Sequence, residues 1–331
     1  MTHHTTTRTM RAVFGERYGN ADGLELRDVP IPEAEAGRVL IKVRAASVNA
    51  FDHHMTTGTP LLVRAVAGLR APKRPVPGAD VAGVVEAVGA DVEGFAVGDR
   101  VFGSIGFGAW AEYASVNPRA IAPLPDEVSF EDGAATPMAG LTALQAIRDL
   151  AGVQSGERVL VNGASGGVGT FAVQIAKAFG ADVAAVCSTH KVEQTEAIGA
   201  DRVLDYTKVD FAREAGAHDV LIDNVGVRPW RATRRVLEAG GRNVATTGPK
   251  RLVLGPLRTT FARKVAAAMD SRSFDSVSAK VNRADLDVLA EMLVDGRISP
   301  VIERTWSLEE APKALATVAE GHAAGKHVIV V

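Results

Sequence analysis

The sequence predicts an α/β protein of two domains, a β-barrel-like domain and a doubly wound domain inserted into it. Three observations lead to this prediction. The chain has 331 residues, more than one hydrophobic core usually serves. Residues 1–130 carry short, closely spaced apolar runs, whereas strand and helix patterns alternate over residues 131–280. Residues 281–331 have too little apolar sequence for a core of their own, so we expect them to return to the first domain.

The first domain is expected to be a compact barrel, because its candidate strands follow one another closely and are separated by Gly, Pro and Asp. Between the second and third of them, residues 59–77 form a Pro- and Arg-containing segment. We expect this segment to be a long, partly helical excursion over the barrel. The candidate strands are Arg11–Gly15, Val39–Ser47, Ala82–Val88, Arg100–Gly103 and Ala111–Val116.

The inserted domain should hold a parallel sheet with helices on both faces, because strands and helices alternate along it. A long helix over Glu131–Asp149, with Ser129 as N-cap, opens the domain. Ser273–Ser278 is a candidate sixth and terminal strand. Other predicted strands are Arg158–Asn162, Asp182–Cys187, Val203–Asp205, Val220–Asp223 and Arg242–Thr246, and the helices are Val168–Phe179, Val192–Ile198 and Arg228–Leu237. The tail should add the helices Arg283–Leu293 and Leu308–Glu320 and the strands Val301–Thr305 and His327–Val330.

Composition excludes several classes of protein. The net charge of −2 gives no bulk attraction for nucleic acid or an anionic membrane. Cys187 is the single cysteine, so disulfide frameworks and thiolate-rich zinc sites are excluded. The polar first residues lack the apolar core of a secretory signal, and the sequence has no run of 18 apolar residues. We therefore expect a cytoplasmic protein.

Residues 158–177 carry the strongest functional signal. The apolar strand over Val159–Val161 is followed by a glycine-rich turn and then by an amphipathic helix. Glycines there permit a tight turn and the close approach of a pyrophosphate, and the helix directs free N–H groups and a positive dipole end at it. A glycine fingerprint between a strand and a helix predicts a dinucleotide-binding Rossmann domain. The contacting residues are expected to be Ala164, Ser165, Gly166, Gly167, Val168 and Gly169.

The second strand of this domain favours NADPH over NADH. NAD sites usually carry an acidic residue at the end of that strand, to bind the ribose 2′-hydroxyl. Here the strand ends without an acid, and Asp182 lies at its opposite end. The hydroxyls of Ser188 and Thr189 and the ammonium of Lys191 would suit a 2′-phosphate. The alternative is that a hydroxyl caps the next helix and the lysine is solvated.

From about Met10 onward, the chain resembles the medium-chain dehydrogenase/reductase superfamily, and most closely its quinone oxidoreductase and zeta-crystallin branch. The resemblance implies a GroES-like barrel, residues 1–130 and 281–331, around an inserted Rossmann domain, residues 131–280. It also implies a homodimer whose nucleotide domains pair edge to edge. It rests on the stretches Ile41–Asn49, Pro77–Gly89, Val97–Gly103 and Asp132–Ala143, and on Gly156, Glu157, Leu160, Ala164–Gly167, Gly169, Gln174 and Lys177.

The resemblance also assigns site residues. It places Asn49 and Asp52 beside the nicotinamide, with Asn49 as the polar contact to substrate or ribose. Alternatively, Asn49 is a turn residue that bonds local backbone. Thr142 is expected near the nicotinamide ribose. Further cofactor contacts carried over are Tyr206, Asn224, Val225, Thr246, Gly248, Lys326, His327 and Val328.

Catalytic zinc is not expected. Zinc-dependent members of the superfamily need thiolate and imidazole ligands, and a catalytic site takes three protein ligands. Where those enzymes carry the cysteine this chain has Asn49, and where they carry Gly-His-Glu it has Gly78-Ala79-Asp80. His53 and His54 are adjacent and would point in different directions.

These features predict an NADPH-dependent, metal-independent oxidoreductase that reduces a small-molecule electron acceptor, a quinone or a conjugated enone. Such acceptors need little help from a Lewis acid, because the negative charge is delocalised. Three alternatives stay open: a zinc-free alcohol dehydrogenase or aldehyde reductase, an enoyl-thioester reductase, and a non-catalytic NADPH-binding crystallin-like protein. No tyrosine lies between Tyr18 and Tyr113, which weakens the enoyl-thioester alternative.

Overall fold

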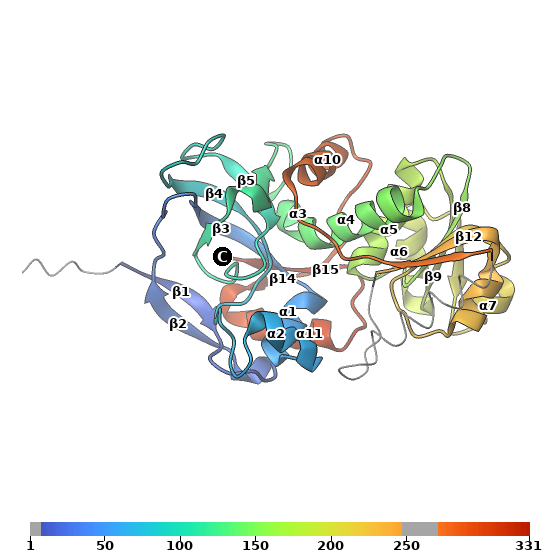
Figure 1. Ribbon diagram of the computed structural model, residues 1–331, viewed down its shortest axis with the longest axis horizontal. Coiled ribbons are helices and arrows are strands. Elements are labelled where there is room, and N and C mark those ends of the chain that lie inside the picture. Colours follow the sequence, from blue (N-terminus) through green and yellow to red (C-terminus); the bar gives the residue numbers. More distant parts are fainter. Residues whose placement is uncertain (1–7, 247–270) are drawn as a thin grey trace, which may run out of the picture.

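The computed structural model describes residues 8–246 and 271–331, and Figure 1 shows them as two lobes side by side along the long axis. The first lobe is built on a seven-stranded sheet with the order β14-β15-β3-β4-β5-β7, in which β6 also pairs with β3. A separate two-stranded sheet, β1-β2, lies beside it. The strands are β1 (Thr9–Phe14), β2 (Glu25–Pro30), β3 (Val39–Val48), β4 (Asp80–Val88), β5 (Arg100–Ser104), β6 (Tyr113–Val116), β7 (Ile121–Pro123), β14 (Ile302–Ser307) and β15 (Lys326–Val330).

The two ends of the chain meet in this lobe, as the sequence predicts. Strand β15 pairs antiparallel with β3, and β14 joins the sheet beside β15. The boundaries at residues 130/131 and 280/281 stay predictions. The sequence analysis missed β2, whose residues are mostly exposed and lack apolar alternation, and β7, which has three residues. Both form because a neighbouring strand supplies their hydrogen bonds.

The excursion after β3 is partly helical, as expected. Helix α1 (Ala50–Thr57) begins directly after Asn49 and ends at Gly58, whose φ of 62° suits a left-handed C-cap. A 3₁₀ turn, η2 (Leu61–Val63), continues into the short helix α2 (Arg64–Ala67). Helix α1 therefore connects the excursion directly to Asn49, the residue that the resemblance places at the nicotinamide.

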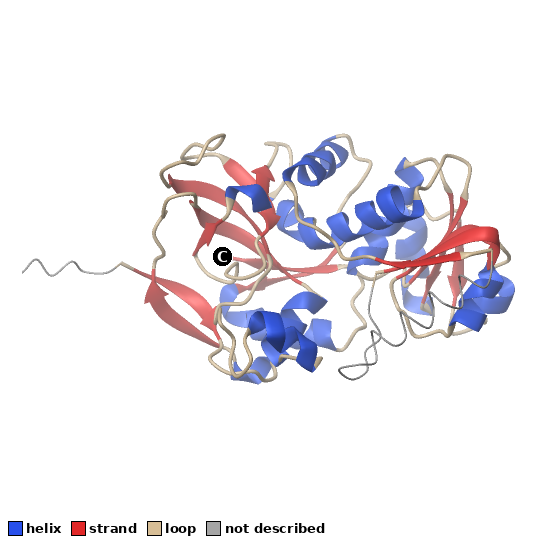
Figure 2. Cartoon of the chain, in the orientation of Figure 1, coloured by secondary structure: helices blue, strands red, loops and turns tan. Residues whose placement is uncertain are grey.

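The second lobe is a doubly wound domain, and Figure 2 shows helices on both faces of its sheet. Its six strands are parallel, in the order β10-β9-β8-β11-β12-β13. The order reverses between β8 and β11, so their carboxyl ends form the crevice in which such sheets bind ligands. The elements are β8 (Arg158–Asn162), α5 (Gly167–Ala178), β9 (Asp182–Cys187), α6 (Val192–Ala197), β10 (Arg202–Asp205), α7 (Phe211–Glu214), β11 (His218–Asp223), α8 (Trp230–Thr233), β12 (Leu237–Ala245) and β13 (Ser273–Ser276).

Two predicted helices are wrong in extent. The helix expected over residues 131–149 is divided into α3 (Phe130–Ala135), α4 (Pro137–Leu144) and a π-helical turn over Gln145–Ala151. Pro137 causes the first break, because it has no N–H to continue α3. The predicted N-cap is confirmed, since Ser129 Oγ accepts from the N–H of Asp132 at 3.0 Å. The helix expected over residues 228–237 is only α8 and a 3₁₀ turn, because β12 already begins at Leu237.

Helices α3, α4 and α5 lie between the two sheets in Figure 1. The largest apolar cluster is continuous across them, and it includes Phe102 of β5, Leu141 of α4 and Phe171 of α5, all buried. The tail adds α10 (Arg283–Val294), with Leu289 in the same cluster, and α11 (Ala311–Ala319) on the barrel. Among the described residues, no helix is long and apolar enough to cross a membrane.

Candidate active site

The glycine turn follows β8, as predicted, and two of its glycines are required by the protein itself. Gly163 has a φ of +76°, and a Cβ there would lie 2.7 Å from Val225 Cγ2. A Cβ at Gly169 would lie 2.1 Å from the backbone oxygen of Gly163. These glycines therefore allow the turn to close and α5 to pack against the strand that precedes it.

Gly166 at the start of α5 is not needed for packing, whereas Gly167 leaves room for a buried lysine. A Cβ at Gly166 would lie 3.7 Å from Gly163 O, an ordinary contact, and one at Gly167 would lie 3.2 Å from Cδ of Lys326, whose ammonium is held by Asn49. Absence of side chains here leaves the first N–H groups of a 12-residue helix accessible. This arrangement fits the pyrophosphate of a dinucleotide, which needs close backbone approach and the positive end of a helix.

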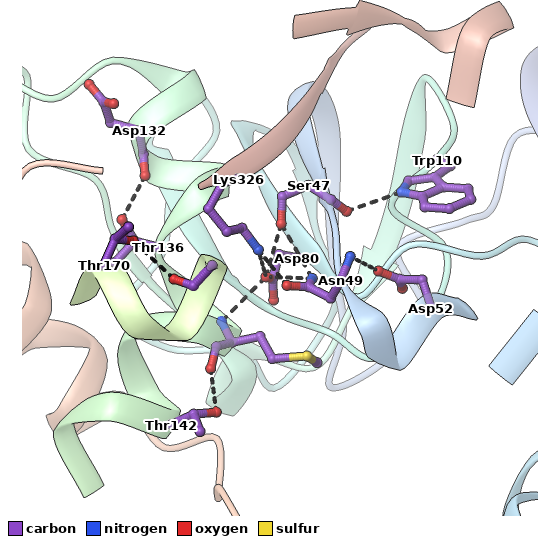
Figure 3. Close-up of polar contacts among 12 residues, drawn as sticks. Ser47, Asn49, Asp52, Asp80, Trp110, Asp132, Thr136, Thr142, Thr170 and Lys326 are labelled. Atoms are coloured by element: carbon purple, nitrogen blue, oxygen red, sulfur yellow. Dashed lines mark hydrogen bonds and ion pairs between the residues drawn. The ribbon is translucent and has the colours of Figure 1, made fainter. Parts of the chain in front are cut away.

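A buried polar cluster lies beside this turn, formed by residues from distant parts of the chain (Figure 3). Lys326 begins β15, Asn49 follows β3 and Asp80 begins β4. The ammonium of Lys326 donates to Asn49 Oδ1 and lies 4.0 Å from Asp80 Oδ2. Asn49 Nδ2 donates to the same carboxylate oxygen at 2.9 Å. Asn49 is thus held by side chains, and not only by local backbone.

Asp80 is the functional residue that sequence reasoning missed. It is fully buried, and its Oδ2 also accepts from Ser47 Oγ at 3.1 Å and from the N–H of Met138 at 3.3 Å. Its Oδ1 is buried and has no hydrogen-bond partner among the described residues. A signal for Asp80 was present, because an acidic residue opening an otherwise apolar strand is unusual unless it is paired.

Burial of the cluster weakens the binding of a proton by the amine of Lys326. Desolvation lowers the pKa of its ammonium, while the carboxylates of Asp80 and Asp52 act in the opposite direction. The lysine is therefore a more readily deprotonated acid than an exposed lysine. It lies within a network that also fixes the neighbouring amide.

Asp52 is brought near the cluster, although its carboxylate points to the helix start. Its Oδ2 accepts from the N–H of Asn49 at 2.7 Å, so it closes the first turn of α1. Burial raises the pKa of Asp52 to about 7, and the hydrogen bond from Asn49 and the charge of Lys326 only partly offset that effect. Asp52 positions Asn49 through the backbone.

Two further residues frame the cluster. Thr142, expected near the ribose, lies on α4 and donates to the carbonyl of Met138 at 2.7 Å. Trp110 is fully buried, and its Nε1 donates to the carbonyl of Ser47 at 3.2 Å. Ser47 and Met138, which both donate to Asp80, are therefore themselves held in place. Trp110 bonds the carbonyl of Ser47, and Thr142 bonds the carbonyl of Met138.

At the other end of the crevice, Lys191 is tied to the C-terminal segment. Its ammonium donates to the carbonyls of His322 at 2.5 Å and Ala323 at 2.9 Å, and burial lowers its pKa. Gln194 Nε2 donates to the next carbonyl, Ala324 O, at 3.1 Å. An ammonium has three N–H donors, so Lys191 retains one for a ligand.

The predicted neighbours of Lys191 are arranged around a carboxylate that the sequence analysis did not consider. Thr189 Oγ1 donates to Asp205 Oδ2 at 2.6 Å, and Lys208 lies 3.3 Å from the same oxygen. Ser188 precedes this turn at the end of β9, and Tyr206 follows Asp205 with 53% of its surface exposed. The end of β9 carries no acid, but Asp205 lies beside it, at the end of the neighbouring strand β10.

The structure brings some of the remaining predicted contact residues to the crevice and places others away from it. Thr246 Oγ1 donates to Asn224 Oδ1 at 2.7 Å, and Val225 packs against the turn at Gly163. These residues lie at the carboxyl ends of β11 and β12 and line the crevice. The structure does not bring the side chains of His327 and Val328 there, since His327 contacts Trp306 and Glu303 and Val328 is fully buried. Gly248 lies outside the described residues.

Comparison with known proteins agrees with this architecture. Two family models match, the alcohol dehydrogenase GroES-like domain over residues 35–126 and the zinc-binding dehydrogenase over residues 198–329. The chain is 33% identical to the chloroplastic quinone-oxidoreductase QR1 of Triphysaria versicolor, over 97% of this chain and 98% of that protein. It is 35% identical to the 2-methylene-furan-3-one reductase of Solanum lycopersicum, over 97% of this chain and 79% of that protein. The solved quinone oxidoreductase from Coxiella burnetii matches with a TM-score of 0.87 and 30% identity, over 98% and 100% of the two chains.

The chain belongs to the medium-chain dehydrogenase/reductase superfamily. Within this superfamily it is a quinone-oxidoreductase-like enzyme with a GroES-like domain and a Rossmann domain, as the sequence predicts. Membership supports a nicotinamide cofactor, and the open glycine cradle at Gly166 and Gly167 fits one.

Zinc, which the name of the second family model implies, does not fit the residues of this medium-chain dehydrogenase/reductase. Asn49 uses both ends of its amide on Lys326 and Asp80, and Ala79 has no donor atom. The ammonium of Lys326 already faces the carboxylate of Asp80 and would repel a metal ion. In residues 8–246 and 271–331, no group of three His, Cys, Asp or Glu side chains is placed to hold a metal.

The raised pKa of Asp52 predicts a pH dependence of stability. Because its pKa is 3.8 in the unfolded chain and about 7 in the folded protein, Asp52 is neutral in both states at low pH. As the pH rises from about 4 to 7, Asp52 loses its proton in the unfolded state but keeps it in the folded state. This stabilises the unfolded state, so the free energy of unfolding of wild type decreases. An amide cannot titrate. We expect the unfolding free energy of Asp52→Asn, relative to wild type, to increase by up to about 4 kcal/mol between pH 4 and 8.

Chemical denaturation across this pH range measures the difference. The control is Asp126→Asn, because the Asp126 side chain is 94% exposed. The control should track wild type at every pH. A constant difference between Asp52→Asn and wild type from pH 4 to 8 would show that Asp52 is ionised throughout.

Proposed function

We propose that this enzyme transfers hydride from NADPH to a quinone or a conjugated enone without a metal ion. The observation that supports this proposal most directly is the buried cluster of Lys326, Asn49 and Asp80 beside the dinucleotide turn. It supplies a fixed cation beside Asn49 and Asp80, the positions at which, by the resemblance, zinc-dependent enzymes carry a cysteine and a Gly-His-Glu motif. The names of two relatives, a quinone oxidoreductase and a 2-methylene-furan-3-one reductase, point to the same class of acceptor.

In this proposal, the residues of the chain stabilise charge and supply a proton. NADPH, when bound, supplies the hydride. Negative charge develops on an oxygen of the acceptor, and the ammonium of Lys326 is the group with N–H donors to spare. Both N–H groups of Asn49 Nδ2 already donate, to Asp80 Oδ2 and to Ser47 Oγ, so Asn49 holds the lysine through its Oδ1. The carboxylate of Asp80 orients both groups, so they need no rearrangement when the charge develops. The lowered pKa of Lys326 also makes it a suitable proton source for the reduced oxygen.

A test of this function combines acceptors with metal removal. After dialysis against a strong chelator, we expect NADPH oxidation with benzoquinone-type acceptors or conjugated enones to persist at an unchanged rate. Simple aldehydes, which need stronger polarisation, should be reduced at least tenfold more slowly, on the order of the effect of one lost electrostatic contact. Spectrophotometry at the NADPH absorbance band measures both reactions. Loss of turnover that added zinc restores, or a preference for aldehydes, would contradict the proposal.

We also propose that the cofactor is NADPH rather than NADH. Support comes from the ammonium of Lys191 beside Ser188 and from the absence of an acid at the end of β9. The carboxylate of Asp205 opposes a 2′-phosphate, but Thr189, Thr207 and Lys208 surround it with donors and a cation. Attraction of a phosphate to this subsite therefore depends on the positive charges of Lys191 and Lys208, which oppose the negative charge of Asp205.

Replacing Lys191 by alanine should weaken NADPH binding more than NADH binding, by about 1.5–3 kcal/mol, because a charge-assisted phosphate contact is lost. Fluorescence titration of both cofactors measures the ratio. Gln194→Ala is the matched control, since it frees the same C-terminal segment without removing a charge. The control should change both affinities equally. Equal losses in Lys191→Ala would place the 2′-phosphate elsewhere.

We further propose a homodimer formed through β13, the edge strand of the Rossmann sheet. The N–H of Val277 donates to Ala245 O inside the chain at 2.8 Å, so a proline there would disturb the fold rather than an interface. Alternate residues of a parallel strand bond the same neighbour, so the N–H of the exposed Ser276 points away from β12, toward the edge of the sheet formed by the described residues. An edge strand of this kind is a ready partner for its symmetry mate.

Ser276→Pro should therefore weaken dimerisation, because it removes an edge donor, whereas Ser276→Ala should not. Sedimentation velocity over a concentration series measures the association. A wild-type mass near 34.7 kDa, or a proline variant that dimerises like wild type, would reject β13 as the interface.

A further inference from the structure

The excursion between α1 and β4 exposes apolar side chains that nothing in the described chain covers. Leu61, Leu62, Val66 and Leu69 are 53%, 52%, 76% and 78% exposed. Single exposed apolar residues are ordinary, but four within nine positions mark an interaction surface. We call these four residues, together with Arg70, Lys73 and Arg74, the excursion face.

Two of the apolar residues, Leu62 and Val66, share one side of a helical stretch. They are four residues apart, and residues 61–67 are helical. The helix ends at Gly68, whose φ is 128°, and Leu69 follows in the non-helical segment beyond it. The residues on the opposite side are directed inward, since Ala67 is buried and Arg64 is half-buried. The excursion therefore has an anchored side and an exposed side.

Specific contacts hold the anchored side in place. The hydroxyl of Tyr18 donates to Gly68 O at 2.5 Å, and the guanidinium of Arg64 lies 4.6 Å from the centre of the Tyr18 ring. Arg64 Nε donates to Gly58 O at 3.1 Å, and the N–H of Lys73 donates to Ala67 O at 2.8 Å. These contacts fix the conformation in which the leucines face outward, so their exposure is a feature of the folded state.

The excursion also has a strong local charge. Residues 53–79 contain Arg64, Arg70, Lys73 and Arg74 and not one acidic residue, although the chain as a whole has a net charge of −2. Arg70, Lys73 and Arg74 are exposed. The acids that flank this range in sequence, Asp52 and Asp80, are both buried and do not offset the charge at the surface. The net charge of the whole chain therefore does not reveal this basic region.

We propose that the excursion face docks on an anionic lipid surface. Leucines that enter the interfacial layer and cations that remain at the headgroups are the chemistry of peripheral membrane segments. The complementarity of charge selects anionic lipid over a neutral bilayer. The exposed aliphatic side chains favour lipid over a purely ionic partner such as an acidic peptide, because the interfacial layer of a bilayer takes up both the apolar and the cationic groups.

Docking would serve the proposed quinone or enone reduction, and this part rests on that function. Helix α1 runs from Asn49 to the start of the excursion, a distance of about 12 Å for eight residues. An acceptor with a long apolar tail dissolves in the bilayer. The docked face would hold the lipid, from which such an acceptor leaves, about one helix length from Asn49.

Vesicle co-sedimentation of the full chain tests the docking. We expect binding to phosphatidylglycerol–phosphatidylcholine vesicles, little binding to phosphatidylcholine alone, and a decrease with added salt. Arg70→Gln/Lys73→Gln and Leu62→Ser/Leu69→Ser should each reduce partitioning on the order of tenfold or more. Arg119→Gln/Arg235→Gln and Val97→Ser, which alter exposed residues elsewhere, are the controls and should bind as wild type.

Absence of binding to anionic vesicles, or equal losses in the control variants, would overturn the proposal. Dissociation of a wild-type dimer by Leu62→Ser/Leu69→Ser, without vesicle binding by wild type, would instead assign the face to a second copy of the chain. Circular dichroism on each variant confirms folding.

A second measurement separates docking from catalysis. With a short-chain, water-soluble quinone, the excursion-face variants should turn over as wild type. With a long-tailed quinone embedded in anionic vesicles, they should lose on the order of tenfold in rate. Vesicle binding without reduction of either quinone would reject the proposed function and retain the docking. Equal rates of all variants on the embedded quinone would reject the delivery of the acceptor through this face.

Discussion

The buried contact of Lys326 with Asn49 and Asp80 is the interaction on which the arrangement of this enzyme depends. It joins the last strand of the chain to Asn49, which lies 277 positions earlier in sequence, and to Asp80. The pairing of β15 with β3 places the lysine there, and the stem of the lysine lies against Gly167 at the start of α5. One side chain thus connects the barrel, the tail and the dinucleotide turn.

Burying charged groups costs free energy, so the cluster that equips the site also restricts which of its residues can be changed. Removing one partner of a buried pair usually destabilises a protein more than removing both, because the remaining charge is uncompensated. Asp80 reduces the cost by accepting three further hydrogen bonds, from Ser47, Asn49 and Met138. The same bonds orient the Asn49 amide. Stability and positioning of the charged and polar groups are therefore properties of one network.

Sequence reasoning reached the fold because its signals are local. The glycine turn, its flanking strand and helix, and the cap at Ser129 all depend on neighbouring residues, and the structure agrees with them. It failed where tertiary contacts decide. Strand β2 forms only by pairing with β1, and Asp80 becomes important only when β3, β4 and β15 meet. Lys191 was identified from its position, but its bonds to the carbonyls of His322 and Ala323 could not be read from the sequence.

A double-mutant cycle on Asp80 and Lys326 tests the central claim most directly. Free energies of unfolding would be measured for wild type, Asp80→Asn, Lys326→Met and the double variant by chemical denaturation at pH 7. If the buried pair organises the site, each single change should destabilise by about 3–5 kcal/mol, and the double variant should be more stable than the sum predicts by about 1–4 kcal/mol. Additive effects, with no coupling beyond about 0.5 kcal/mol, would contradict the account.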